Sequence, residues 1–442
     1  MRKFTADYLF TGREMAAKGS VLVTKDDGTV EAILPPANTG DPAANPDAWA
    51  ADAGNAGATD AGDDVEVFRG LLTPGFVNCH CHLELSHMKG LLPEKTGMVD
   101  FLLTVIRGRD ASSGRGVPSG GGKDTLPGKD PAIIPEAIAV AEESMLHNGI
   151  VAVGDICNTS HTLQQKGEGR MYYHNFIETM GFIEQTAPDR LQTALQVFQD
   201  FAQDFALPIA ANSVVPHAPY SVSPRLFQLI ANFPGNQLIT IHNQESQAEN
   251  QFCQTGQGDF LRLYQALGLD VSFFQGTGKR SLASYLPYFY RNQTLLLVHN
   301  VDTRAEDLEW LRQWKGGIAG GNDHAGPNVR WCLCPNANLY IGGQLPDVDL
   351  LMRYDCSIVL GTDSLASNHQ LDILEEMKTL QRHFEHLSTA TLLQWATYNG
   401  AEALQLDGVL GEFAPGKQPG VVVIGGLENG RFTGQSRAQR LL

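Results

Sequence analysis

The sequence predicts an α/β fold: a (β/α)₈ barrel of the TIM type with a small β-sandwich domain formed from both chain termini. Three observations support this prediction. Short apolar runs alternate with helix-like segments, eight of these runs end in polar or titratable residues, and both chain ends have strand-like patterns outside this alternation. A chain of 442 residues is long enough for one large barrel and an accessory domain.

The eight apolar runs are the expected barrel strands. Each run is largely continuous in apolar residues, as is typical of parallel strands that are covered on both faces. The predicted strands span residues 71–82, 149–157, 171–182, 209–219, 238–245, 294–301, 328–336 and 356–364. Between them, segments 134–149 and 370–387 have helical periodicity, and Gly149 is suited to end the first of these helices.

The predicted domain order follows from these patterns. Residues 71–408 are expected to form the barrel, and residues 1–70 and 409–442 the small β domain. Two low-complexity segments, 36–64 and 108–130, are rich in Gly, Asp and other small or polar residues. Such composition cannot form a core, so both segments are predicted to be surface insertions, the first of them flexible.

Composition and charge restrict the classes of partner. A net charge of −17 argues against a nucleic-acid partner, which requires a basic surface. The chain has no apolar run of about 18 residues, so no membrane span is expected. Seven cysteines without framework spacing, and no secretory signal pattern, predict a cytoplasmic protein with reduced thiols. The expected partner is a small-molecule substrate, and homo-oligomerisation is left open.

The ends of the predicted strands contain residues that ligate metals. In a (β/α)₈ barrel the functional groups project from the C-terminal ends of strands. The first strand ends in His80-Cys81-His82, where alternation points both imidazoles to one side. Further candidates follow later strands: His217, His242, Glu245, His299 and Asp363. Three imidazoles and one carboxylate suit zinc, and also iron or manganese, so these strand ends predict a site for a divalent metal ion.

Two other patterns have simpler interpretations. Cys332 and Cys334 have the spacing of a ligand pair, but a buried apolar strand explains them better. His82-Leu83-Glu84 matches the His-x-Glu of zinc cytidine deaminases, whose Pro-Cys-x-x-Cys partner motif is absent from this sequence.

Six motifs occur in an order that resembles a known family. TPGFVNCHCH, VVPHAPYSVS, TIHNQES, LLVHNVD, CPNANLYIGG and VLGTDSLASN resemble the deaminase and chlorohydrolase branch of the amidohydrolase superfamily. The resemblance extends from about Leu71 to Gly420 and includes GEFAPGKQPGVVVIGG. It implies that His80, His82, His242 and Asp363 ligate the metal, and that Glu245, His299 and Asp363 are catalytic. Binuclear members use a carboxylated lysine, and strands three and four contain none, which favours one metal.

The resemblance also implies the reaction and the residues that contact the substrate. The implied reaction is hydrolytic deamination, with Glu245 as the proton shuttle, Asp363 as the acceptor of the water proton, and His299 hydrogen-bonded to the nucleophile. The run His82-Leu83-Glu84-Leu85-Ser86, followed by DFLLTVIRGR, is similar to aminodeoxyfutalosine deaminases of menaquinone biosynthesis. The substrate contacts that it implies are His217, Glu84 and Arg107 or Arg109. Asn336 and Asn338 are further candidates because they follow the seventh strand, where polar side chains can face the substrate.

Several of these assignments have alternatives. Glu84 is equally well placed to support neighbouring residues, the two arginines to be solvated, and the two asparagines to shape their loop. The implied substrate is an aminopurine nucleoside, and the competing activities are S-adenosylhomocysteine, methylthioadenosine or adenosine deamination, guanine deamination and halotriazine hydrolysis. A metal-binding scaffold without activity is the alternative outside the enzymes. Zinc is the expected ion, and the same ligands accept iron.

Overall fold

The computed structural model describes residues 1–36, 64–113, 133–203, 211–314 and 326–442. Two compact units contain these residues. Unit 1 comprises Met1–Cys79, Glu143–Val153 and Asp372–Leu442, and unit 2 comprises His80–Glu142 and Gly154–Leu371. The domain boundaries expected after residues 70 and 408 stay a prediction. Residues 37–63, nearly all of the first low-complexity segment, lie outside the described residues.

Unit 1 contains one mixed sheet of six strands in the order β14-β13-β4-β1-β2-β3. Strands β1 and β4 pair in parallel and the other neighbours pair antiparallel. Both chain termini contribute to it, as predicted, and the sandwich expected here corresponds to a single hydrogen-bonded sheet. Phe4, Leu22, Leu72 and Val423 belong to its buried core. The elements of unit 1 are β1 (Arg2–Leu9), β2 (Val21–Thr24), β3 (Val30–Leu34), β4 (Val65–Thr73), α12 (Ile373–His383), α13 (Thr389–Ala396), α14 (Tyr398–Ala403), β13 (Val422–Gly425) and β14 (Arg437–Arg440).

Three elements run from one unit into the other, and the rest of the chain's elements belong to unit 2. The first group consists of β5 (Phe76–Cys81), α2 (Ile133–His147) and β6 (Ile150–Cys157). The strands of unit 2 are β7 (Tyr172–Thr179), β8 (Ala211–Pro216), β9 (Leu238–Asn243), β10 (Thr294–His299), β11 (Asn328–Leu333) and β12 (Ile358–Leu360). Its helices are α1 (Met98–Ser113), α3 (Leu163–Lys166), α4 (Ala187–Gln203), α5 (Pro224–Ala231), α6 (Gln247–Thr255), α7 (Phe260–Ala266), α8 (Ser281–Tyr285), α9 (Ala305–Gln313), α10 (Pro335–Ile341) and α11 (Val348–Arg353).

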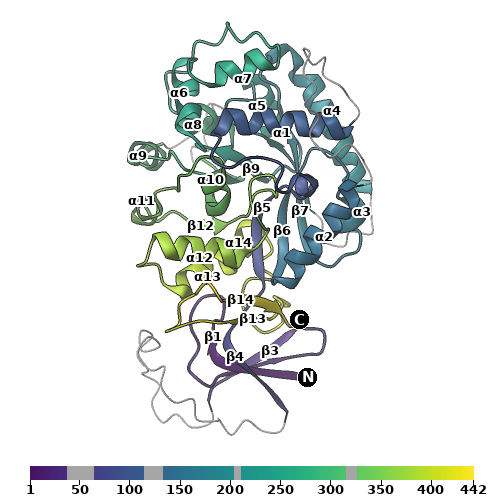
Figure 1. The fold of residues 1–442 in the computed structure, drawn as a ribbon, viewed down its shortest axis with the longest axis vertical. Coiled ribbons are helices and arrows are strands. Elements are labelled where there is room, and N and C mark those ends of the chain that lie inside the picture. Colours follow the sequence, from purple (N-terminus) through teal and green to yellow (C-terminus); the bar gives the residue numbers. More distant parts are fainter. Residues whose placement is uncertain (37–63, 114–132, 204–210, 315–325) are drawn as a thin grey trace. The chain divides into compact units, whose positions relative to one another are not determined.

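Strands β5 to β12 form the predicted barrel. They lie in two four-stranded sheets, β5-β6-β7-β8 and β9-β10-β11-β12. The sheets meet on one side where Cys81 forms a parallel bridge with Asp363. On the other side the backbone N–H of His242 donates to the carbonyl of His217 at 3.0 Å. Helices α3 and α4 flank the strands β6 and β7 in Figure 1. Helix α4 contacts β7 and β8, and α5 contacts β8, so the (β/α)₈ fold class is confirmed.

Local sequence explains where the helices of the barrel begin and end. Ser223 caps α5 by accepting a hydrogen bond from Leu226, and Pro224 occupies the first turn. Ser246 caps α6 in the same way, and Gly256 ends that helix with a left-handed φ of 67°. These caps place the first residues of each helix directly after the polar ends of the strands.

Two predicted elements differ from the structure. The run 71–82 is two strands, β4 and β5, because Pro74 and Gly75 interrupt the ladder and Pro74 has no N–H to donate. The second low-complexity segment begins inside α1, which continues to Ser113, so its first residues are helical. Residues 114–132 lie outside the described residues.

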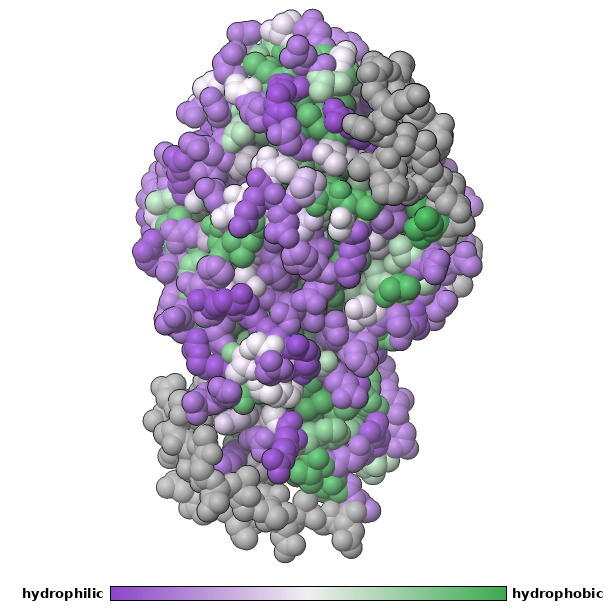
Figure 2. Space-filling model, in the orientation of Figure 1, coloured by the Kyte–Doolittle hydropathy of each residue, from purple (hydrophilic) through white to green (hydrophobic). Residues whose placement is uncertain are grey.

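Hydrophilic residues cover most of the face seen in Figure 2. None of the helices in the described part of the chain is long and apolar enough to cross a membrane.

Candidate metal centre

Two of the predicted ligands lie at the end of β5, a strand whose six residues are all buried. His80 is in the strand and His82 follows it, so alternation brings both imidazoles to the same side. The N–H groups of Thr362 and Asp363 both donate to the carbonyl of His80 at 3.0 Å. The backbone itself therefore holds the ligands of the first and eighth barrel strands next to each other.

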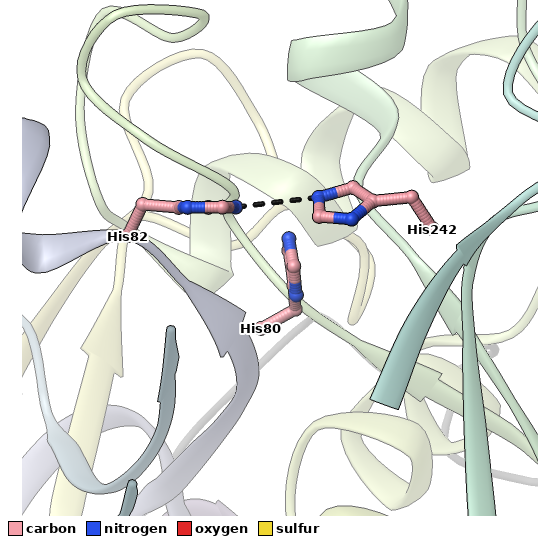
Figure 3. A group of neighbouring side chains, drawn as sticks. All are labelled: His80, His82 and His242. Atoms are coloured by element: carbon pink, nitrogen blue, oxygen red, sulfur yellow. Dashed lines mark hydrogen bonds between the residues drawn. The ribbon is translucent and has the colours of Figure 1, made fainter. Parts of the chain in front are cut away.

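Four ligand atoms converge at this point (Figure 3 shows the three histidines). His82 Nε2 lies 3.3 Å from His242 Nε2. Asp363 Oδ1 lies 3.6 Å from His80 Nε2 and 3.4 Å from His82 Nε2. Zinc–nitrogen and zinc–oxygen bonds are about 2.0–2.2 Å long, so neighbouring ligands of a tetrahedral site are about 3.4 Å apart. These three separations are therefore those of neighbouring ligands around a single tetrahedral metal ion.

The chemistry of the donors also fits a cation. His242 Nδ1 contacts the carbonyl of His217 at 2.8 Å, so this nitrogen carries the proton and Nε2 presents its lone pair. Burial, together with His217 and His80, lowers the pKa of His242 to about 4, which keeps the ring neutral. A neutral imidazole whose lone pair faces other ligand atoms is the form that binds a divalent metal.

Glu245 and His299 lie beside these ligands. Glu245 Oε1 is 3.4 Å from His299 Nε2. The amide nitrogen of Asn338 donates to His299 Nδ1 at 2.9 Å, so the ring proton is on Nε2, toward Glu245. Burial raises the pKa of Glu245 well above its usual value, and Asp363 and Glu249 raise it further. The pair thus combines a carboxyl group that holds a proton with an N–H donor.

Glu249, which the sequence analysis did not single out, fixes the backbone of Glu245. Its carboxylate accepts the N–H of Gln244 at 2.7 Å and that of Glu245 at 3.1 Å. It also accepts a hydrogen bond from the hydroxyl of Ser281. The pattern Ser246-x-x-Glu249 has the spacing of a capping box, and this is the sequence signal that could have identified the residue.

Four of the eight non-glycine residues with positive φ in the described part of the chain lie at the ends of these strands. Gln244, His299, Asn300 and Asp363 have positive φ values of 48°, 77°, 62° and 57°. Non-glycine residues adopt this conformation rarely and at a cost of about 1–3 kcal/mol each. Three of the four are site residues or immediate neighbours of Glu245. The fold therefore holds strained backbone at the positions that orient the candidate ligands and proton-transfer groups.

A pocket of about 40 Å³ lies beside Glu245. Its lining residues are Met98, Glu245, Ser246, Val301, Asn338, Ile341, Gly342 and Gln344. Asn338 is thus both the partner of His299 and part of the pocket wall. Asn336, also a predicted substrate contact, is half-buried at the start of α10.

His217 and Glu84 have different surroundings. The His217 ring lies beside the His242 ring, with centroids 4.8 Å apart, and is half-buried. Glu84 is 4% exposed. Its Oε2 accepts hydrogen bonds from the N–H groups of Asn158 and Thr159 at 3.1 and 3.0 Å, and from the Thr159 hydroxyl at 2.8 Å. These bonds show Glu84 holding the loop after β6, and a contact with substrate stays a prediction.

The two predicted arginines lie along α1. Arg107 is exposed and follows the pocket residue Met98 by nine positions. This separation corresponds to about 13.5 Å along a helix axis. The side chain of Arg109 lies outside the described residues, so the predicted arginine contacts with substrate stay untested.

A second buried cluster, at the end of β6, was not predicted. Asp155 Oδ1 accepts the N–H of Leu83, the residue after His82, at 2.8 Å. Asp155 Oδ2 lies 2.5 Å from Lys166 Nζ, and both side chains are fully buried. Lys166 also donates to Asn175 Oδ1 at 2.7 Å and to Cys157 Sγ at 3.3 Å. The cluster anchors the turn that carries His82, and no local motif marks it in the sequence.

A barrel with a candidate metal site at the ends of its strands is the arrangement of metal-dependent hydrolases, and the family comparison agrees. Residues 71–440 match the family model described as Amidohydrolase family. This match covers most of the chain, which therefore belongs to the amidohydrolase family.

Several relatives of the chain are deaminases by name. It is 26% identical over 362 residues to "Aminodeoxyfutalosine deaminase" of a Nitratiruptor species, covering 80% of this chain and 78% of that protein. Helicobacter pylori aminofutalosine deaminase in complex with methylthio-coformycin superposes with a TM-score of 0.73 at 20% identity, covering 98% and 94% of the two chains. A zinc-bound adenosine deaminase from Xanthomonas campestris gives a TM-score of 0.62 at 20% identity, covering 96% and 84%.

Proposed function

We propose that the protein is a hydrolase that uses one divalent metal ion to deaminate an aminopurine nucleoside-like substrate, with 6-amino-6-deoxyfutalosine the first compound to test. The observation that carries the proposal is the placement of Glu245 and His299, 3.4 Å apart, beside four converging ligand atoms. A structural metal site needs neither residue. The names of the relatives support an aminopurine as the substrate.

The residues of the site suit this reaction. A bound divalent ion supplies Lewis acidity, which lowers the pKa of water to about 7. Glu245 Oε1 delivers its proton to the ring nitrogen next to the amine-bearing carbon. It then takes up the proton of the hydroxyl added to that carbon and passes it to the departing amine, and the proton that Asp363 accepts from water afterwards restores Glu245. His299 donates its Nε2 proton as a hydrogen bond to the attacking oxygen. Asp363, whose Oδ2 is held by the Ser367 hydroxyl at 2.6 Å, accepts the proton released by water.

Zinc is the proposed ion, because three imidazoles and a carboxylate at tetrahedral spacing are a zinc donor set and a related structure contains zinc. Metal analysis of the purified protein tests this, and a stoichiometric iron content would replace zinc by iron. We further propose that the enzyme acts in the cytoplasm on a free small molecule.

The substrate is tested by measuring ammonia release from a panel of amines. The panel contains 6-amino-6-deoxyfutalosine, adenosine, methylthioadenosine, S-adenosylhomocysteine and guanine, with a halotriazine assayed for chloride. We expect the highest kcat/KM for the first compound. Turnover of only those nucleosides that lack a 5′-linked benzoate would reject the futalosine assignment and retain a nucleoside deaminase. Chloride release alone would reject deamination.

Glu245→Gln tests the role of the proposed proton shuttle. Removing a general acid–base group lowers turnover by about 10²–10⁴-fold, and we expect this loss with the metal content unchanged. Glu168→Gln is the matched control, because Glu168 is a largely exposed carboxylate in the same unit. Unchanged turnover would remove Glu245 from the mechanism, and loss of metal would indicate that it serves the ligand set instead.

A further inference from the structure

The end of β7 holds a buried carboxylate for which the reaction proposed above has no use. Glu178 is 6% exposed. Its Oε2 accepts a hydrogen bond from the amide nitrogen of Asn158 at 3.0 Å. Its Oε1 has no hydrogen-bond partner in the described part of the chain. Buried polar atoms are nearly always paired, and leaving one without a partner costs about 1–3 kcal/mol or more.

Asn158 adds a second acceptor of the same kind. Its amide nitrogen is used by Glu178, and its Oδ1 is buried and has no partner among the described residues. The backbone of Asn158 is held by Glu84, so the loop that carries this amide is fixed. Two neighbouring oxygen acceptors are thus fixed in place, each without a donor.

These acceptors lie next to the proposed metal ligands but do not orient them. Glu178 Oε1 is 3.7 Å from His242 Nδ1, which is beyond hydrogen-bond distance. The proton on His242 Nδ1 already goes to the carbonyl of His217 at 2.8 Å. Glu178, His217 and His242 nevertheless place ligand-type atoms within 4.8 Å of one another. Glu178 Oε1 is therefore about one imidazole ring away from the metal-binding Nε2 of His242.

His217 lies in the same region. The Ser221 hydroxyl donates to the carbonyl of Ala218 at 3.1 Å and therefore accepts from His217 Nδ1 at 2.8 Å. In this arrangement the lone pair of His217 is on Nε2. His217 and Asn158 are both partly exposed, so this region borders on solvent.

A group that satisfies several neighbouring acceptors must carry several donors. Ammonium groups and hydroxyl groups both meet this requirement. A cationic group one imidazole ring from a divalent ion would be repelled by it, whereas a neutral hydroxyl would not. Sugar hydroxyl groups are therefore the chemistry that fits.

We propose that Glu178 Oε1 and Asn158 Oδ1 form a subsite that accepts hydrogen bonds from the hydroxyl groups of the substrate's sugar, and so select ribonucleosides. The inference rests on the proposed deaminase function and deepens it, because it names the part of the substrate that the ends of β6 and β7 recognise. It also assigns a role to the third barrel strand, at which the sequence analysis placed no site residue.

The test compares a ribonucleoside with the 2′,3′-dideoxynucleoside of the same base, using metal-loaded protein. We expect the wild type to prefer the ribonucleoside. Glu178→Gln should lower kcat/KM for the ribonucleoside by about 10–100-fold, the usual effect of losing a hydrogen bond to a charged group. It should change kcat/KM for the dideoxynucleoside less than twofold. Asn158→Ala, a second variant independent of the carboxylate, should reduce the same preference.

One control variant and two further outcomes distinguish failure of the subsite from failure of the proposed function. Glu168→Gln should change neither substrate. Equal losses on both substrates, or a lower metal affinity of Glu178→Gln, would overturn the subsite and assign Glu178 to the ligand set. If the wild type deaminates no aminopurine, the proposed function fails by itself. In that case the affinities of the wild type for the ribonucleoside and the dideoxynucleoside are measured by calorimetry. Equal affinities would overturn the proposed subsite.

Discussion

The ends of β6 and β7 each hold a buried carboxylate, and the two differ in how their hydrogen-bonding capacity is used. Asp155 has a backbone N–H on one oxygen and the ammonium group of Lys166 on the other. Lys166 in turn uses its three donors on Asp155, Asn175 and Cys157. Glu178 has a partner on Oε2 alone among the described residues.

This difference distinguishes structural support from ligand binding. Burial alone would lower the pKa of Lys166, but Asp155 and Cys157 raise it above its ordinary value, so the lysine remains charged. In this cluster every donor and acceptor described above has a partner within the protein, so none remains for a ligand. Removing one charged member leaves the other charge buried without its partner. Replacing a carboxylate that has an unpaired oxygen should change the unfolding free energy of the ligand-free protein little, because the missing hydrogen-bond donor is supplied by a ligand.

Lys166→Met is expected to have the largest effect on stability. The substitution leaves Asp155 buried without its counter-charge, which costs about 3–5 kcal/mol of unfolding free energy. The measurement is urea denaturation of the metal-loaded protein. Metal affinity should also fall by about 10–100-fold, because Asp155 holds the turn after His82.

A double variant tests the physical reason for this loss. Asp155→Asn with Lys166→Met keeps an oxygen for the N–H of Leu83 and removes both charges. At least half of the lost stability should return, and metal affinity with it. A double variant as unstable as Lys166→Met would show that packing volume, and not the unpaired charge, accounts for the effect.

Asp372 is an intermediate case, a buried carboxylate with a backbone donor. It caps α12 by accepting the N–H of Leu374 at 2.8 Å. Burial, together with repulsion from Glu375, raises the pKa of Asp372 from 3.8 to about 6. The folded protein therefore binds this proton more tightly than the unfolded chain, and its stability falls as pH rises from about 4 to 6. At about 1.36 kcal/mol per pKa unit, the cost above pH 6 is up to about 3 kcal/mol.

Asp372→Asn isolates this effect, because asparagine caps helices as well as aspartate does. The variant and the wild type should have similar unfolding free energies at pH 4. At pH 7.5 the variant should be the more stable of the two by up to about 3 kcal/mol. A constant difference between the two proteins across this range would exclude titration of Asp372 as the cause.

Metal removal tests the proposed metal ligands, and its effect is also measured as a change in the free energy of unfolding. Ligand at 100 times its Kd stabilises a folded protein by about 2.7 kcal/mol. We expect zinc to restore this amount to chelator-treated protein. His82→Ala should abolish the increment, and His161→Ala, which changes an exposed histidine, should keep it. Equal stabilisation of both variants would place the metal elsewhere.

The metal ligands and the residues that support them also differ in how far they could be predicted from the sequence. The strand ends were predicted because continuous apolar runs and period-two alternation are local, and they place His80 and His82 on one side of β5. The barrel then brings His242 and Asp363 to them. The resemblance to a known family identified Glu245 and His299.

The supporting residues were not predictable because their partners are distant in sequence. Asp155 meets Leu83 across 72 positions, and Glu249 meets Ser281 across 32. No spacing rule links such pairs, since the tertiary fold alone joins them. The break between β4 and β5 was missed for a different reason: the apolar character continues through Thr73-Pro74-Gly75, although Pro74 cannot take part in the ladder.

Glu178→Gln should have the smallest effect on the stability of the free protein. The glutamine oxygen still accepts the Asn158 amide, and no partner of Oε1 among the described residues is lost. We therefore expect a change within about 1 kcal/mol of the wild type, measured by the same denaturation as Lys166→Met. A loss of several kcal/mol would place Glu178 with the saturated clusters and remove the basis for a subsite at β7. A small change combined with lost selectivity for ribonucleosides would show that burial alone does not mark a structural carboxylate, and that the unpaired oxygen does mark a binding one.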